Sequence, residues 1–208
     1  MAAKWLILDA MGVIFETGDD VNDLLVPFIQ GKNGAIRRET IHELYRRASL
    51  GEISSASFWG SLGLGGAYPE IETEYLDTCL TLDPNFMAVA NELVKTRSLA
   101  LLSNDVSEWS DYLRAKYGLN RIFSVTVVSG DVGLRKPDRR IYSLLLERMD
   151  SNPRDCTFLD DRARNLRTAC EMGMRTIRFA REESDECFLA DVEIRGLPEL
   201  SGALARLH

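Results

Sequence analysis

The feature that most constrains the fold is a regular alternation of short apolar runs and helical segments in the second half of the chain. Four runs rich in apolar or β-branched residues are predicted strands: Leu99–Ser103, Phe123–Val128, Cys156–Asp160 and Arg175–Phe179. Segments with helical periodicity surround them: Asn85–Arg97, a helix started by a capping box of Asp105 and Glu108, a helix after Pro137, and Ala163–Met172. This order predicts an α/β fold with a parallel sheet and right-handed crossovers.

The first predicted strand, Trp5–Asp9, is not followed by a simple crossover helix. Residues from about Asp19 to Leu80 instead predict several helices: Val21–Ile29, Ile36–Leu50, a short helix capped by Ser55, and Glu70–Leu80. We therefore predict a core formed by residues 1–17 and 83–208, with residues 18–82 inserted after the first strand as a small α-helical cap. Its tethers, Glu16–Gly18 and Leu82–Asn85, are the expected hinges of a lid.

Composition narrows the class of ligand. The 208 residues carry 32 acidic and 25 basic side chains, a net charge of -7, which argues against nucleic acid or an anionic membrane as the partner. The longest uncharged stretch, Ile53–Pro69, is too short to span a bilayer. The start of the chain does not resemble a signal peptide, and the four cysteines lack metal-site spacing and are expected to be buried free thiols. We expect a cytoplasmic protein that binds a small anionic substrate.

Polar side chains stand where the predicted strands end. Asp9 ends the first strand, Ser103–Asn104 the second and Asp160–Asp161 the fourth, while Lys136 follows the third. Ligands of parallel sheets bind at the carboxyl ends of the strands, so these groups are expected to meet. Gly12 is grouped with the substrate-binding residues because it lets the backbone turn directly behind Asp9.

Each of these residues has a structural explanation when taken alone. Asp9 could cap a helix or bind a ribose, and Ser103 and Asn104 could cap a turn. The Asp160–Asp161 pair could cap the helix that follows it, and Lys136 could be a solvated surface lysine. Three carboxylates at one edge would repel one another, however, and together they call for a cation. Mg²⁺ prefers oxygen ligands and retains waters that a substrate oxygen can replace. The combined pattern predicts an Asp9 carboxylate that attacks an anionic substrate beside Mg²⁺ and Lys136.

Four segments, in order, carry a family resemblance: LILDAMGVIF, LLSND, GLRKPD and FLDDRARN. Through these segments, nearly the whole chain resembles the haloacid dehalogenase-like hydrolase superfamily. The residues of its motifs are most similar to the phosphatase branch that includes the N-terminal domains of soluble epoxide hydrolases. The resemblance implies a Rossmann-like, doubly wound parallel sheet with a small helical cap. It also implies that Asp9 is the nucleophile and that Mg²⁺ is held by Asp9, the backbone carbonyl of Met11 and Asp161, with Asp160 alongside. Three further residues would hold and neutralise the transferred group: Ser103, Asn104 and Lys136.

Position 11 departs from the phosphatase pattern, D-x-D, because Met11 replaces the second aspartate. That aspartate protonates the leaving oxygen in family phosphatases, and a thioether cannot do so. Candidate replacements include Glu16, His42 and carboxylates of the cap, and the sequence does not select among them.

Three functions remain open on the sequence. The first is a Mg²⁺-dependent hydrolase of a small phosphorylated metabolite that acts through an aspartyl intermediate on Asp9. The second is a 2-haloacid dehalogenase or a phosphonate hydrolase, since neither needs the second acid; the phosphonate hydrolase would need a cap lysine, for which Lys32 is the only candidate in residues 18–82. The third is a catalytically impaired protein that binds a phosphorylated ligand or a regulatory partner.

Overall fold

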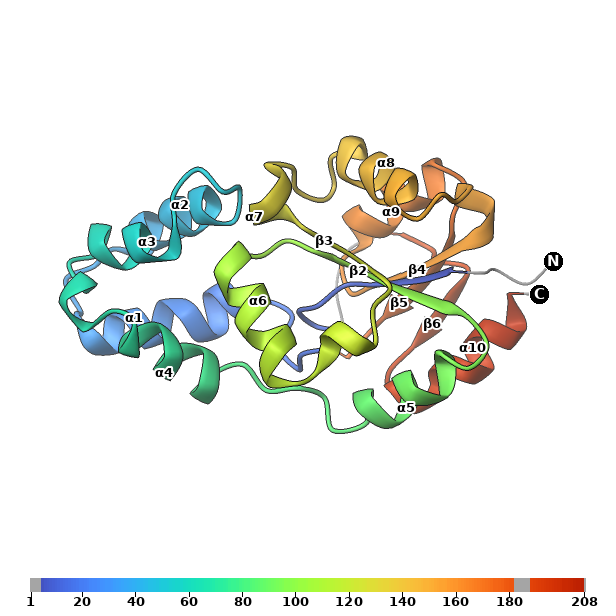
Figure 1. Cartoon of the computed structure of the whole chain (residues 1–208), viewed down its shortest axis with the longest axis horizontal. Helices are drawn as coiled ribbons and strands as arrows, with labels where there is room; N and C mark the ends of the chain where they lie inside the picture. Colours follow the sequence, from blue (N-terminus) through green and yellow to red (C-terminus); the bar gives the residue numbers. More distant parts are fainter. Residues whose placement is uncertain (1–4, 182–187, 208) are drawn as a thin grey trace.

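The computed structural model describes residues 5–181 and 188–207, which form one six-stranded parallel sheet (Figure 1). Its strands are β1 (Trp5–Leu8), β2 (Ser98–Ser103), β3 (Val125–Val128), β4 (Cys156–Asp160), β5 (Arg175–Phe179) and β6 (Val192–Ile194). Their order, β3-β2-β1-β4-β5-β6, puts β1 between β2 and β4, with Leu8 paired to Leu101 and Leu159. The predicted α/β fold with a parallel sheet is confirmed, and β6 is a strand that the sequence did not predict.

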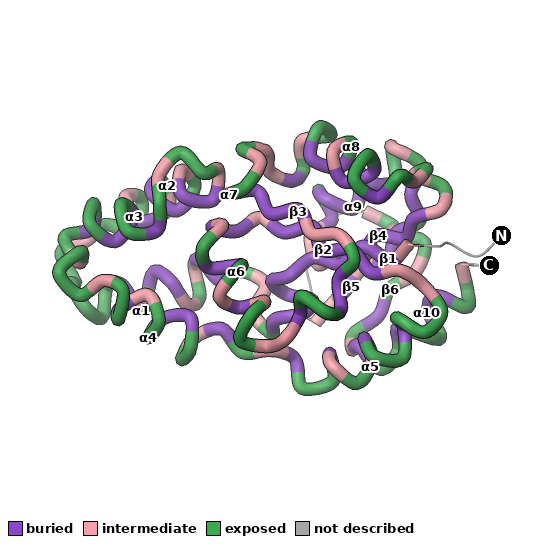
Figure 2. The backbone as a smooth tube through the Cα atoms, in the orientation of Figure 1, coloured by how far each residue is buried: buried purple, intermediate pink, exposed green. Residues whose placement is uncertain are grey.

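Helices cover both faces of the sheet, because alternate residues of each buried strand point to opposite sides. On β1, Ile7 packs with α8 (Arg139–Arg148) and α9 (Ala163–Glu171). Leu6 and Leu8 belong to the opposite cluster, to which α5 (Phe86–Leu93), α6 (Ser107–Lys116) and α10 (Leu200–Arg206) contribute. The short helix α7 (Ser129–Val132) follows β3. The central strands β1, β2 and β4 are consequently buried along almost their whole length (Figure 2).

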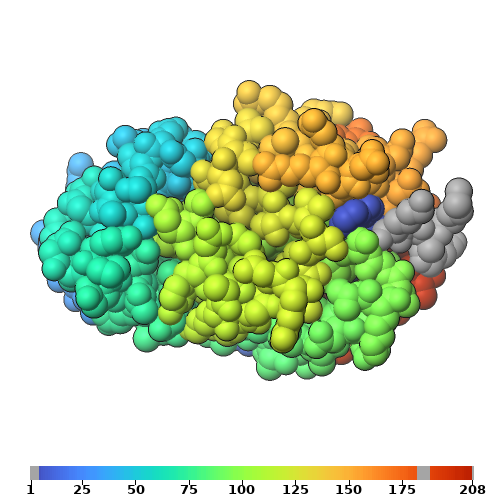
Figure 3. All heavy atoms as spheres, viewed as in Figure 1, coloured from blue at the N-terminus to red at the C-terminus, as the bar shows by residue number. Residues whose placement is uncertain are grey.

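A block of helices, here called the helical insert (residues 20–78, counting Asp20 as the N-cap of its first turn), lies between β1 and α5 in the chain. It begins with a π-helical turn, η1 (Val21–Leu25), and continues as α1 (Val26–Lys32), α2 (Arg38–Ala48), α3 (Ser55–Ser61) and α4 (Glu70–Thr78). The insert forms one end of an elongated molecule, and the chain termini lie toward the other end (Figures 1 and 3).

Two local predictions were wrong. Ser54, not Ser55, caps α3, since the Ser54 hydroxyl accepts a hydrogen bond from the backbone of Ser57. The predicted capping box of α6 does not form either. Asp105 accepts instead from the backbone of Val106, and Glu108 reaches across to the backbone of Ser55 in the insert. A local contact thus engages Asp105, and a tertiary contact takes Glu108 away from the cap.

The expectation of buried free thiols holds only in part. Cys156 is free and buried, Cys79 is free and half-buried, and Cys170 is exposed on the outer side of α9, which corrects the prediction for that residue. Cys187 lies outside the described residues. Within residues 5–181 and 188–207, no helix has the length and apolar character required to cross a bilayer.

Candidate active site

A cleft of about 700 Å³ lies between the carboxyl edge of the sheet and the helical insert. From the core it is lined by Asp9, Asn104 and Lys136, all of which were predicted from the sequence. From the insert, Tyr45 and His42 of α2 contribute to its wall. The predicted convergence of sequence-distant segments at one edge of the sheet therefore occurs.

The centre of the cleft floor is a buried lysine between two carboxylates. The Lys136 ammonium nitrogen lies 2.6 Å from Asp9 Oδ1 and 2.9 Å from Asp160 Oδ2. The three side chains are at most 9 % exposed. Buried charges of this kind are tolerated only when they are paired and hydrogen-bonded, which excludes the interpretation of Lys136 as a solvated surface residue.

Asp160 holds this arrangement in place. Besides Lys136, its carboxylate accepts hydrogen bonds from the backbone of Arg162 at 2.8 Å and from the Asn165 amide at 3.0 and 3.1 Å. The Tyr142 hydroxyl in turn donates to the Asn165 carbonyl. With both oxygens occupied by donors, Asp160 is suited to orienting its neighbours.

Asn104 fixes the lysine from the other side. Its side-chain oxygen accepts from the Lys136 backbone N–H at 2.8 Å, and its side-chain nitrogen donates to the Lys136 carbonyl at 3.0 Å. Both ends of the amide are thereby engaged with the loop before α8. Ser103 lies beside it at the end of β2, and its hydroxyl is buried without a hydrogen-bond partner, as expected of a group that awaits a ligand.

Asp161 is the least satisfied acid of the site. Its Oδ1 atom is buried and has no hydrogen-bond partner. The carboxylate fits between two glycines: a Cβ atom at either Gly12 or Gly18 would lie 2.5 Å from Asp161 Oδ2. Gly12 also has φ +78°, which a side chain would strain. Only glycine at both positions leaves room for the Asp161 carboxylate.

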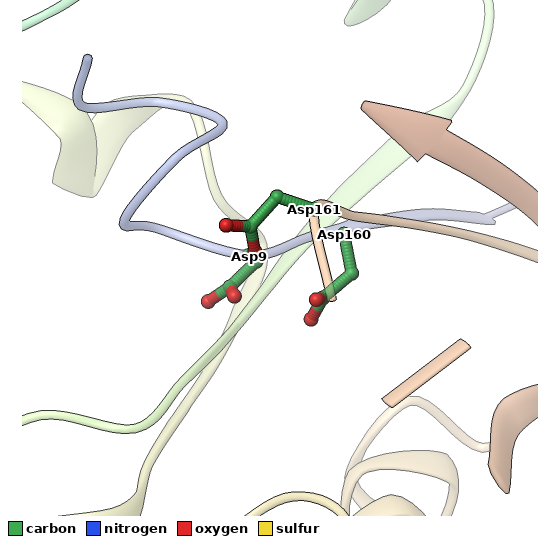
Figure 4. A group of neighbouring side chains, drawn as sticks. All are labelled: Asp9, Asp160 and Asp161. Atoms are coloured by element: carbon green, nitrogen blue, oxygen red, sulfur yellow. The ribbon is translucent and has the colours of Figure 1, made fainter. Parts of the chain in front are cut away.

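Asp9, Asp160 and Asp161 converge (Figure 4), and one oxygen from each lies within 4.8 Å of the other two. Burial, followed by the charge of Asp160, raises the pKa of Asp161 to about 8. Burial also raises the pKa of Asp9 to about 7, against the opposing charge of Lys136. The carboxylates raise the pKa of Lys136 in spite of its burial. One ammonium does not balance three carboxylates, so the residues fit an additional cation with oxygen ligands.

The loop that carries Asp9 is held by a residue distant in sequence. Arg181 donates to the carbonyls of Gly12 and Val13 at 3.2 Å each and forms an ion pair with the buried Asp83. Asp9 Oδ1 itself accepts from the backbone of Ala10 at 2.6 Å. These contacts fix the direction of the nucleophile candidate, and neither Arg181 nor Asp83 carried a signal in the sequence.

Other cleft residues were also missed from sequence. Asn165 stands in the FLDDRARN segment but was given no role, although its position on the inner side of α9, five residues after Asp160, could have suggested one. Arg162 and Arg135 line the cleft and bond to the Gly18 carbonyl and the Ser49 hydroxyl. Asp20, at the start of the insert, is a buried acid in the cleft wall.

Comparison with known proteins gives relatives of several activities. The chain is 42% identical to mouse acyl-CoA dehydrogenase family member 10 over 62 residues, 30% of this chain and 6% of that protein. It is 28% identical over 138 residues to flavin mononucleotide hydrolase 1 of Arabidopsis thaliana, which covers 63% of this chain and 56% of the plant protein. The chain thus spans about half of one of these relatives and a small part of the other.

The fold is similar to solved structures. A HAD phosphatase from Thermococcus onnurineus superimposes with a TM-score of 0.74 and 23% identity over 97% of both chains. A sequence profile for haloacid dehalogenase-like hydrolases matches residues 4–173, which include every segment that builds the cleft floor. On this match, the chain belongs to the haloacid dehalogenase-like hydrolase family.

Proposed function

We propose that this protein is a Mg²⁺-dependent hydrolase of small phosphate monoesters, with Asp9 as the nucleophile. The observation that carries the proposal is the grouping of Asp9, Asp160 and Asp161 around one lysine, with one buried Asp161 oxygen left without a partner. Clustered carboxylates of this kind suit a divalent cation and an anionic substrate better than any structural role. Membership of a hydrolase family supports the same class of reaction.

In this reaction each residue of the cleft floor would have a distinct role. Asp9 attacks phosphorus, the bond to the leaving oxygen breaks, and an aspartyl phosphate forms that water then hydrolyses. Lys136 neutralises negative charge beside Asp9, Ser103 donates to a phosphoryl oxygen, and Asn104 and Asp160 hold Lys136 in place. Mg²⁺ held by Asp9, Asp161 and the Met11 carbonyl would supply positive charge at the phosphoryl group.

The helical insert would act as a cap that closes the cleft and selects the substrate. Support comes from the cleft lining, since residues of α2 face the Asp9 loop across it. The proposed division of the chain places the core at residues 1–17 and 83–208 and the cap at residues 18–82. Arg181 and Asp83 connect the second tether, Leu82–Asn85, to the Asp9 loop. A movement of the cap would therefore displace the loop that carries the nucleophile.

The test is phosphate release from acetyl phosphate and 4-nitrophenyl phosphate by the purified full chain with Mg²⁺. We expect Asp9→Asn to lower turnover by at least about 1,000-fold, because an amide cannot attack phosphorus. Asp150→Asn, which changes the same side-chain type at an exposed site, should turn over normally. EDTA should abolish the activity, and added Mg²⁺ should restore it; full activity in chelator contradicts the metal-dependent mechanism.

Carbon–halogen cleavage is the second candidate, and Met11 favours it because a halide leaves without a proton. Chloride release from a 2-chloroacid, in place of phosphate release, would establish it. A phosphonate hydrolase has less support, since Lys32 is bound to Glu74 at 2.7 Å and does not line the cleft. Release of neither phosphate nor halide would favour a ligand-binding or regulatory protein.

A further inference from the structure

We propose that the Asp20 carboxyl is the general acid and base of this site and replaces the group that Met11 lacks. The inference rests on the proposed phosphatase function. Asp20 opens the helical insert, eleven residues after Asp9 in the chain, and faces the cleft that Asp9 and Met11 also line. Within the described part of the chain, Asp9 and Asp20 are the two buried carboxyls of the cleft lining.

The segment leading to Asp20 passes directly over the acidic cluster. Gly18 packs against the Asp161 carboxylate so closely that a Cβ atom would lie 2.5 Å from its oxygen. Arg162, the residue after Asp161, donates to the Gly18 carbonyl at 2.8 Å. The charge of Arg162 acts on Asp9, Asp161 and Asp20 alike. Asp20 therefore follows a segment that is held against the acidic cluster, and it lines the same cleft as Asp9.

The other candidates for the missing acid are placed less well. Glu16 is exposed and does not line the cleft. His42 lines the cleft, but its Nε2 atom is bonded to Asn22 at 2.9 Å. Glu43 is exposed and bound to Arg46. Asp20 alone among these alternatives combines burial, a cleft position and a carboxyl group.

The environment of Asp20 also suits proton transfer near neutral pH. Burial raises its pKa to about 7, assisted by the charge of Asp19 and opposed by Arg162. The other titratable groups that act electrostatically with it are Tyr45, Tyr75 and Asp105, on α2, α4 and the loop before α6. A carboxyl with such a pKa can donate a proton in one step and accept one in the next.

The proton balance of the two steps is complete. As the Asp9 oxygen bonds to phosphorus, the bond from phosphorus to the leaving oxygen breaks and its electron pair stays on that oxygen, which takes the Asp20 proton and departs as an alcohol. Asp20, now ionised, accepts a proton from the water that attacks the aspartyl phosphate. The bond from phosphorus to Asp9 then breaks, inorganic phosphate leaves, and Asp20 is again protonated.

The test compares leaving groups in the Mg²⁺-supplemented full chain: 2,4-dinitrophenyl phosphate, 4-nitrophenyl phosphate, phenyl phosphate and an alkyl phosphate. Asp20→Asn should lower kcat on the alkyl ester by about 100- to 10,000-fold and on the dinitrophenyl ester by less than about tenfold, because a good leaving group needs no proton. The native chain is expected to lose alkyl-ester turnover above about pH 7 as Asp20 ionises, and Asp20→Asn should remove this loss. Asp150→Asn, the same change of side chain at an exposed residue outside the cleft lining, should leave all rates unchanged.

A second variant guards against a purely structural effect. Met11→Asp added to Asp20→Asn should recover alkyl-ester turnover by at least about tenfold, since it restores an acid beside Asp9. Equal losses on all leaving groups, unchanged alkyl-ester turnover in Asp20→Asn, or no recovery in the double variant would each overturn the role of Asp20. These results leave the proposed function intact if the native chain releases phosphate; if it releases none from any ester, the proposed function falls and this inference with it.

Discussion

The helical insert meets the core along two contrasting surfaces. On one side is an aromatic seam, in which Trp109 of α6 packs against Phe58 and Tyr75 of the insert with ring centroids 5.5 and 5.3 Å apart. Elsewhere the insert and the core face each other across the charged cleft, whose lining includes the buried carboxyls of Asp9 and Asp20. Burial of aromatic area stabilises the first surface, whereas burial of carboxylates costs stability at the second. The apolar burial in the seam thus offsets part of the stability lost by burying carboxylates in the cleft.

The seam also contains a polar centre around the half-buried Glu72. Trp59 of α3 and Trp109 donate their indole N–H groups to the same Glu72 oxygen at 2.9 and 2.7 Å. The cleft acids differ from this centre in that burial raises the pKa of Asp9 and of Asp20 to about 7. The contrast teaches that buried carboxyls with raised pKa values, rather than unsatisfied polar groups in general, mark the functional site, because the seam also contains a buried Tyr75 hydroxyl without a hydrogen-bond partner.

Among these substitutions, removal of the indole at the centre of the seam should have the largest effect on the free energy of unfolding. Trp109→Ala is expected to lower the free energy of unfolding by about 3–5 kcal/mol, because it deletes a fully buried indole that touches several rings. Urea denaturation followed by circular dichroism measures it. Leu189→Ala, at a residue 97% exposed, should change stability by less than about 0.5 kcal/mol. A loss under about 1 kcal/mol for Trp109→Ala would mean that the seam does not hold the insert.

A substitution in the cleft, Asp20→Asn, should instead raise the free energy of unfolding. The folded-state pKa of Asp20 is about 7 and its ordinary value is 3.8, so its contribution to stability is greatest below pH 3.8 and is lost as the pH rises through 7. Asp20→Asn should therefore gain stability relative to the native chain, by about 2 kcal/mol more at pH 8.5 than at pH 5.5. Denaturation at the two pH values measures this difference, and a pH-independent effect would contradict the raised pKa.

A smaller effect is expected at the polar centre of the seam. Glu72→Gln keeps the shape of the side chain but replaces a charged acceptor by a neutral one, and should cost about 1 kcal/mol. The free energy of unfolding and the tryptophan fluorescence both report it. Glu147→Gln on the exposed side of α8 is the matched control. A gain in stability would place Glu72 with the strained acids of the cleft and remove the contrast between the two surfaces.

Much of the architecture was predictable because it follows from local periodicity. The strands Cys156–Asp160 and Arg175–Phe179 occur with the predicted bounds, and the insert contains its predicted helices to within a few residues. The short β6 was missed, since three residues without a marked apolar run give no periodic signal. Local caps failed where a distant partner competed, as when Glu108 bonded to the insert instead of its own helix.

The sequence by itself determined the parallel sheet, the inserted helices and the meeting of Asp9, Lys136 and Asp161 at one edge, because parallel strands bring their carboxyl ends together whatever surrounds them. Tertiary structure alone decided which of these groups is satisfied. Asn104 turned out to hold the Lys136 backbone, and Asp20, one of several acids in the insert, became the one that is buried in the cleft lining. Burial and hydrogen bonding between distant segments set the charge and direction of each side chain, and neither quantity is encoded in the spacing of residues along the chain.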